Sequence, residues 1–229
     1  MSNLVLREPL KPIVKWSGGK KDELKHILPH IPEDYTTYLE PFIGGGAVYF
    51  HLNPEKSVIN DVHKELTDFY QSIKNGKSDE IYAFMAQHPN EEETYYKVRG
   101  YDNEDMLDNA KRFYYLRKTC FRGMLRYNSK GKFNIPYGRY KTYNFEEIRN
   151  NEFTDYGYCS FGKEEHIKLA DCFKKTSIKC LMIIGKTPFI EELYKGYVVS
   201  EYDKKYRFKL HSGRVGNEIN NKHLIIKNY

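Results

Sequence analysis

Apolar residues recur at the spacing of a helix along much of the chain, most clearly between residues 62 and 75. Side chains three and four positions apart share one face of a helix, so such a run predicts a helix with one side in a core. Asn75 and Gly76 then supply the turn residues that end it. The apolar positions of this run are Val62, Leu66, Phe69, Tyr70 and Ile73.

Similar patterns predict further helices, and short apolar runs predict strands between them. Helices are expected at residues 22–28, 47–52, 78–87, 91–99, 103–120, 163–175 and 188–194. Strands are expected at residues 13–16, just before Gly44, and at 58–61, 180–184, 197–202, 206–211 and 223–227.

Helices and strands alternate in the first and last thirds of the chain, which favours an α/β fold. The 229 residues are enough for one such domain and a small lobe. Three consecutive helices interrupt the alternation. We therefore predict a core formed by residues 1–76 and 142–229, with a helical lobe inserted at residues 77–141.

The stretch from Leu39 to Phe50 contains three glycines between a predicted buried strand and a predicted helix. Glycine lets the backbone turn tightly and approach a ligand, and the free N–H groups of the helix would point at that ligand. The next strand ends in Asp61, where an acid can accept ribose hydroxyls. Tyr49 stands where the dinucleotide fingerprint has its last glycine. Both a nucleoside-type cofactor site and a plain turn remain open.

Residues 13–20 place two glycines and Lys20 after a predicted strand. The Walker spacing and the following Ser or Thr are absent, which excludes a phosphate loop of that type. Two interpretations remain. The segment is either a loop that approaches a ligand with one aromatic face, Trp16, and one cation, or a simple turn from strand to helix.

The formal charge of 37 − 31 = +6 is concentrated in one segment. Residues 111–141 hold ten basic residues and no acid, so the rest of the chain has 27 bases against 31 acids. Aromatic residues lie among those bases, namely Phe121, Tyr127, Phe133, Tyr137 and Tyr140. Cations that neutralise phosphates beside aromatic rings that stack on bases are typical of a nucleic-acid arm. The alternative is a solvated basic helix face, but such faces normally carry both signs of charge.

The four cysteines lack the spacing of metal ligands, and we expect free thiols in a reducing cytoplasm. No apolar run is long enough to span a membrane, and residues 1–10 lack the core of a signal peptide.

Several of these segments together resemble the Dam-type (D12 class) DNA adenine-N6 methyltransferases. Residues 15–20 look like the family's N-terminal cofactor loop, residues 40–46 like its S-adenosylmethionine motif, and Asn60-Asp61 like its ribose-binding acid. Residues 122–128 followed by 133–141 are similar to its DNA-recognition hairpin. These motifs occur in the family's order, and the order of segments matches along most of the chain.

The resemblance implies a Rossmann-like methyltransferase core with an inserted DNA-recognition lobe. It implies that S-adenosylmethionine is bound by Trp16, Lys20, Phe42, Gly44 and Asp61. It assigns DNA contacts to Arg122, Met124, Arg126, Pro136 and Tyr140. By the same resemblance Arg126 reads a guanine edge as a fork, and Arg122 fills the space beside a flipped adenine.

The chain departs from the family where catalysis is expected. Family members have two more strands after the hairpin, the second ending in the catalytic tetrapeptide Asp-Pro-Pro-Tyr, which holds adenine N6 in line with the methyl group. Here only residues 142–152 separate Lys141 from Phe153, and they contain no apolar run. Asp155 and Tyr158 keep the D-x-x-Y spacing and are the catalytic stand-ins. Ile184-Gly185 also stands where Ser-Asn is usual.

The resemblance implies methyl transfer to adenine N6 in duplex DNA, with GATC, the family's commonest target, as the expected site. The alternatives are a non-catalytic DNA-binding relative and an RNA-binding module; the hairpin resembles a duplex-reading arm rather than a stacking sheet. We expect a monomer, and a cognate restriction endonuclease is a candidate partner.

Overall fold

The computed structural model describes residues 8–16, 18–102, 105–150, 155–157, 163–206 and 219–229. The chain forms two compact units, one from residues 1–22 and 34–160 and the other from residues 23–33 and 161–229. The mixture of helices and strands confirms the predicted mixed α/β class, whereas the predicted lobe boundaries at residues 77 and 141 stay a prediction.

The first unit contains a parallel sheet in the order β1-β2-β3, formed by Tyr38–Glu40, Ser57–Asn60 and Asp155–Gly157. Helix α2 (Ala47–Leu52) connects β1 to β2 as predicted. β1 is the edge strand of this described sheet, and its middle residue Leu39 is 61% exposed. The expected burial of that strand is therefore wrong, because within the first unit β1 pairs with a described strand on one edge only.

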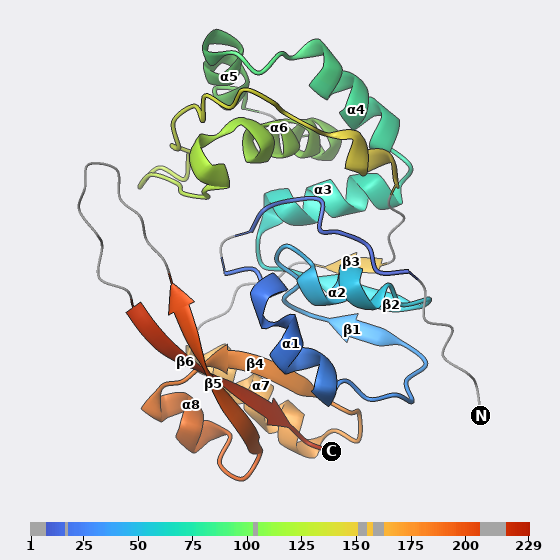
Figure 1. Cartoon of the computed structure of the whole chain (residues 1–229), viewed down its shortest axis with the longest axis vertical. Helices are drawn as coiled ribbons and strands as arrows, with labels where there is room; N and C mark the ends of the chain where they lie inside the picture. The colour runs from blue at the N-terminus through green and yellow to red at the C-terminus, as the bar shows by residue number, and fades with distance from the viewer. Residues whose placement is uncertain (1–7, 17, 103–104, 151–154, 158–162, 207–218) are drawn as a thin grey trace. The chain divides into compact units, whose positions relative to one another are not determined.

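Helices α3 (Lys64–Lys74), α4 (Ser78–Gln87), α5 (Glu92–Arg99) and α6 (Met106–Thr119) follow in the same unit. α3 lies between the sheet and α6 (Figure 1). Phe69 of α3 stacks on Tyr114 of α6 with ring centroids 5.0 Å apart, and both side chains are fully buried. Burial of one large apolar side chain stabilises a fold by about 1.5–3 kcal/mol, so this aromatic layer is what fixes α6 on α3.

The predicted strand at residues 13–16 is wrong. Ile13 and Val14 are buried, but the backbone bends there and pairs with none of the described strands. The N–H of Gly19 donates to the carbonyl oxygen of Trp16 at 3.1 Å, so the segment turns at once. The apolar run therefore reflects burial in the core of the unit and not a sheet position.

The second unit contains an antiparallel sheet in the order β4-β6-β5, formed by Leu181–Gly185, Ile219–Lys227 and Val198–Tyr206. Its helices are α1 (Leu24–Ile27), α7 (Lys163–Lys175) and α8 (Pro188–Leu193). The short 3-10 segments of the chain are η1 (Lys21–Glu23), η2 (Leu28–His30), η3 (Phe121–Gly123) and η4 (Glu146–Asn150). The predicted strand at 206–211 lies outside the described residues except for Tyr206, which ends β5.

A buried carboxylate joins the helical segment of the second unit to its sheet. Glu23 pairs with Nδ1 of His223 at 2.7 Å and with Nζ of Lys204 at 2.7 Å, and it also accepts from the Tyr202 hydroxyl. Glu23 and His223 are both almost fully buried. A buried charge needs such partners, so this cluster fixes the residues before α1 against β5 and β6.

Candidate functional site

The glycine turn follows β1 at its carboxyl end, the side on which α/β sheets bind ligands. Gly44 and Gly46 have φ angles of +52° and +69°, which side chains other than glycine rarely adopt. A Cβ on Gly44 would lie 2.8 Å from Cδ1 of Trp16, and one on Gly45 would lie 2.8 Å from Cβ of Trp16. The missing side chains therefore let Trp16 lie directly on the turn, and two segments predicted to hold a cofactor meet here.

Asp61 lies beside the same turn. One of its carboxylate oxygens accepts from the N–H of Gly44 at 2.7 Å, and the other accepts from the N–H of His63 at 3.0 Å. The N–H of Ile43 donates to the carbonyl of Asn60 at 2.8 Å. Neighbouring parallel strands β1 and β2 thus bring the glycine turn and the acid together. Asp61 is 7% exposed, and its carboxylate fixes the turn and the start of α3.

The other two predicted cofactor-binding residues are Phe42 and Lys20. Phe42 is 45% exposed next to the glycine turn. Lys20 is half-buried in the segment after Trp16. The cofactor roles of Trp16, Lys20, Phe42, Gly44 and Asp61 stay predictions.

Glu40, at the end of β1, is a residue of this site that the sequence analysis did not assign. Burial raises the pKa of its carboxyl to about 7, although hydrogen bonds from the Tyr38 hydroxyl and the Tyr49 backbone N–H oppose the shift and the Asp61 charge adds to it. The Tyr38 hydroxyl lies 2.8 Å from the carboxylate. Its position before Pro41 in the glycine motif was a signal that could have pointed to it.

The segment after α6 forms an irregular antiparallel hairpin. Isolated bridges join Cys120 to Tyr137 and Tyr127 to Phe133. The N–H of Asn128 donates to the carbonyl of Lys132 at 2.9 Å, and the N–H of Gly131 donates to the carbonyl of Asn128 at 2.9 Å. Backbone pairs of this kind hold a loop in register, as the similarity to a recognition hairpin implied.

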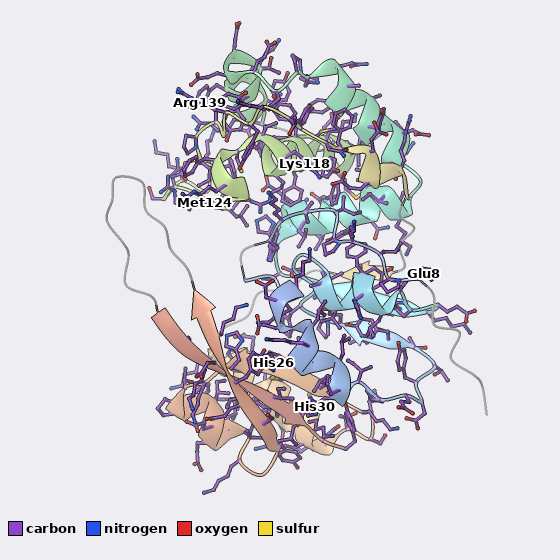
Figure 2. The ribbon with its side chains drawn as sticks, viewed as in Figure 1. Glu8, His26, His30, Lys118, Met124 and Arg139 are labelled. Carbon is purple, nitrogen blue, oxygen red and sulfur yellow. The ribbon has the colours of Figure 1, made fainter. Side chains whose placement is uncertain are left out.

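The predicted DNA-contacting side chains occupy this hairpin. Arg126 is exposed, and its Nε donates to Oδ1 of Asn134 across the hairpin at 2.8 Å. Arg122 and Pro136 are exposed, while Met124 and Tyr140 are half-buried. Figure 2 shows Met124 and Arg139 on the segment that follows α6. The structure thus brings the five residues onto one continuous segment, and their DNA contacts stay predictions.

The structure divides the ten basic residues of 111–141 into two groups. Four of them, on α6, are paired or buried within the unit: Lys111 pairs with Asp108, Arg112 with Glu65 and Lys118 with Glu147, while Arg117 is 2% exposed. The other six, on the hairpin, are exposed: Arg122, Arg126, Lys130, Lys132, Arg139 and Lys141. Two of these six make ion pairs at the surface, Lys132 with Asp102 at 3.5 Å and Arg139 with Glu92 at 3.4 Å. The expected patch of ten is therefore corrected to a patch of six.

The catalytic stand-ins are only partly within the described residues. Asp155 begins β3 and pairs in register with Val58, whereas Gly157 pairs with Asn60. Asp155 therefore lies two residues before the carboxyl edge at which Asp61 lies. Tyr158 lies outside the described residues, and the catalytic role of both stays a prediction.

A family model for D12 class N6 adenine-specific DNA methyltransferases matches residues 16–152, which is more than half of the chain. The chain belongs to that family. This confirms the predicted enzyme class. The matched residues contain the glycine turn, Asp61 and the hairpin, and end before Asp155.

Named relatives agree with this membership. The chain is 55% identical to the type II methyltransferase M.CviBI of Paramecium bursaria Chlorella virus NC1A, over 96% of this chain and all of the relative. It is 31% identical to the type II methyltransferase M1.LlaDCHI of Lactococcus lactis, over 85% of this chain and 88% of the relative. It is 33% identical to the DNA adenine methylase of Haemophilus influenzae, over 60% of this chain and 50% of the relative.

The alignment to the viral methyltransferase spans 260 positions, whereas this D12-class chain has 229 residues. At 31 or more of the aligned positions, therefore, the relative has a residue and this chain has a gap. In the part of the chain that the structure describes, no helix is long and apolar enough to cross a membrane.

Proposed function

We propose that this chain binds S-adenosylmethionine at the glycine turn and acts on the N6 amino group of adenine in duplex DNA, within the sequence GATC. The observation that supports this most directly is the contact of Gly44 with Asp61 at 2.7 Å beneath Trp16. It brings three separate sequence motifs together in a member of a family of adenine-specific DNA methyltransferases.

The residues around the turn fit a nucleoside with a charged tail. Asp61 would accept ribose hydroxyls with the lone pairs that its two backbone bonds leave, and Trp16 and the exposed ring of Phe42 would contact the base and the methionine part. When bound, S-adenosylmethionine would supply a methyl group activated by its sulfonium. The protein's own contribution is to orient that group and exclude water.

The hairpin would read DNA with its exposed side chains. Arg126, oriented by Asn134, would donate both ends of its guanidinium to a guanine edge. The six exposed bases would neutralise phosphates and make binding strongly salt-dependent. Because N6 lies inside the duplex, the target adenine must leave the stack, and Arg122 would fill the space that it vacates. We include helices α4–α6 and this hairpin, residues 77–141, in the recognition lobe of a Rossmann-like core.

A second candidate is a DNA-binding relative without catalysis. It is favoured by two observations: the absence of at least 31 positions relative to the viral methyltransferase, and the register of Asp155 with Val58 rather than with the carboxyl edge of β2. Positioning supplies about 7–11 kcal/mol of a reaction barrier only when the reacting groups are held in line. Without a group that holds N6, transfer would be very slow.

Tritiated methyl transfer to duplexes distinguishes the two candidates. The substrates are a GATC duplex, a scrambled duplex, and a pool randomised around a central adenine, from which the methylated products are sequenced. Robust transfer enriched in GATC supports the enzyme. Binding of S-adenosylhomocysteine and of duplex DNA without transfer supports the non-catalytic relative, and a preference for RNA over duplex DNA in competition contradicts both.

A further inference from the structure

The recognition hairpin is attached to the cofactor side of the first unit by a buried arginine. Arg117, at the end of α6, donates from Nη1 to the carbonyl of Met124 at 2.7 Å and from Nη2 to the carbonyl of Lys15. Its guanidinium also lies 5.6 Å from the centre of the Trp16 ring. One planar cation therefore touches the residue before Trp16, the Trp16 ring, and a predicted base-reading residue.

Because Arg117 is buried, its guanidinium depends on acceptors within the protein. Arg117 is 2% exposed, and a buried charge is costly unless its donors have partners. Its acceptors here are two neutral carbonyls on separate loops. The fixed fork of arginine can reach both at once, whereas lysine offers a single point charge. The buried Nε of Arg117 has no hydrogen-bond partner among the described residues, so movement of either loop away from the other would leave a further donor of the cation without an acceptor.

A second, independent connection starts at Asp61. His63, whose N–H donates to Asp61, accepts the N–H of Leu66 on its Nδ1 at 3.3 Å. In the neutral ring the proton must then be on Nε2, which faces the Tyr127 hydroxyl at 2.9 Å. Burial lowers the pKa of His63, which favours this neutral form.

The chain of hydrogen bonds continues from the hairpin into α3 and α6. The Tyr127 hydroxyl donates to Glu65, and the other oxygen of Glu65 accepts from Arg112 at 2.7 Å. Every group in this series has a defined donor or acceptor direction. Tyr127, which is adjacent in sequence to Arg126, is thus linked through His63 to the acid beside the glycine turn.

Close backbone approach supports the same connection. Gly123 has a φ angle of +58°, and a Cβ there would lie 3.4 Å from Cδ of Lys15. The hairpin therefore begins in direct contact with the segment that carries Trp16.

From these contacts we propose that Arg117 and Tyr127 are positioning residues that couple occupancy of the cofactor site to duplex binding by the hairpin. The inference rests on the proposed function, because both ligands are assigned there. A ligand that orders Trp16 and Asp61 orders one end of each connection. Duplex DNA then meets a hairpin that has already lost part of its conformational freedom, so the two ligands favour each other.

The test measures the ratio of the S-adenosylhomocysteine Kd without DNA to its Kd with a saturating GATC duplex. The reverse ratio, for the duplex with and without S-adenosylhomocysteine, must be equal because coupling is reciprocal. We expect about tenfold in the wild type, within the usual range of about 5- to 150-fold. S-adenosylhomocysteine carries no methyl group to transfer, so the measurement does not depend on catalysis.

Tyr127→Phe and Arg117→Lys should each lower this ratio below about threefold, while the Kd of S-adenosylhomocysteine alone changes less than the ratio does. Tyr143→Phe is the matched control. Its hydroxyl lies within hydrogen-bond distance of two carbonyl oxygens in the first unit, those of Met85 at 2.7 Å and His88 at 2.9 Å, and donates its single hydrogen between them. The ratio for this variant should stay at the wild-type value. Circular dichroism and thermal melting confirm folding, and Tyr127→Phe, which only removes an oxygen, carries the test if Arg117→Lys unfolds.

A wild-type ratio of one with both ligands bound would overturn the coupling and leave the proposed function intact. So would variants that keep the wild-type ratio, or a Tyr143→Phe control that loses it equally. Failure of S-adenosylhomocysteine or the duplex to bind at all would instead overturn the proposed function, and this inference with it.

Discussion

The substitution Gly45→Ala should displace Trp16. An added Cβ would clash with Trp16 at both Gly44 and Gly45, but Gly44 also has a positive φ angle, so only at Gly45 does the clash act without backbone strain. The added Cβ would lie 2.8 Å from Cβ of Trp16 and 3.4 Å from the carbonyl of Val14. Carbon atoms prefer about 3.5–4.0 Å, so Trp16 or the turn must move by about 1 Å. The clash involves the root of the tryptophan side chain, and rotation about its own bonds cannot relieve it.

The magnitude follows from that displacement. Overpacking costs about 1–3 kcal/mol of unfolding free energy, and the reduced freedom of the unfolded chain returns about 0.4–1 kcal/mol. The proposed cofactor site would lose a well-placed aromatic contact, worth about 0.5–1.5 kcal/mol. Together with the shifted turn, we expect the Kd of S-adenosylhomocysteine to rise about 5- to 30-fold, which corresponds to about 1–2 kcal/mol.

Gly76→Ala is the matched control. Gly76 has a φ angle of +74° and no atom within 4 Å of the added Cβ. Alanine there costs about 1–2 kcal/mol of stability through its left-handed backbone, but it should leave the Kd within twofold. The two variants thus separate loss of stability from loss of the site.

Trp16 is the single tryptophan of the chain, so its fluorescence reports on the site directly. Titration with S-adenosylhomocysteine should change the emission of the wild type and of Gly76→Ala alike. A Gly45→Ala protein with an unshifted emission maximum and the wild-type Kd would refute the displacement of Trp16, whereas a shifted maximum with the wild-type Kd would show that Trp16 takes no part in binding.

Three further predictions concern charge and burial. The carboxyl of Glu40 has a pKa of about 7 against an ordinary value of 4.5, so the folded state holds its proton more tightly and the unfolding free energy should fall as pH rises from about 4.5 to 7. Glu40→Gln should remove that slope and raise the unfolding free energy by about 1–2 kcal/mol at pH 8, as measured by urea unfolding. Identical slopes in the wild type and the variant would contradict this prediction. Arg126→Ala should lower the binding free energy for the target duplex by about 1–3 kcal/mol and relax the specificity at one base position. Lys130→Ala should weaken binding to all duplexes alike in salt-dependent binding assays. Equal losses of affinity for target and scrambled duplexes in Arg126→Ala would contradict its role in reading a base. Burial raises the pKa of Cys120 to about 11, and Cys172 is exposed. Iodoacetamide at pH 8 should therefore label Cys172 before Cys120, as peptide mass spectrometry would show. Equal labelling of the two in the folded protein would contradict the burial of Cys120.

Local pattern was sufficient for much of the helical structure. Residues 47–52, 78–87 and 163–175 are helical with the predicted bounds, because the spacing of apolar positions and the flanking turn residues act within a few residues of each other. The meeting of Gly44 with Asp61 was also predictable. Two parallel strands joined by one helix place their carboxyl ends side by side, so the order of motifs already implied the contact.

Position within the fold decided what pattern could not. Residues 13–16 are apolar because they enter the core at a bend, and the same composition would suit a strand. Arg117 and Arg126 belong to one run of basic residues, yet one is buried between two loops and the other is exposed on the hairpin. A count of basic residues does not say which side chains face the core and which face solvent, because this depends on how α6 packs against α3. The link from His63 to Tyr127 spans 64 positions, and hydrogen bonds between such distant residues exist only once the tertiary structure has brought their partners together.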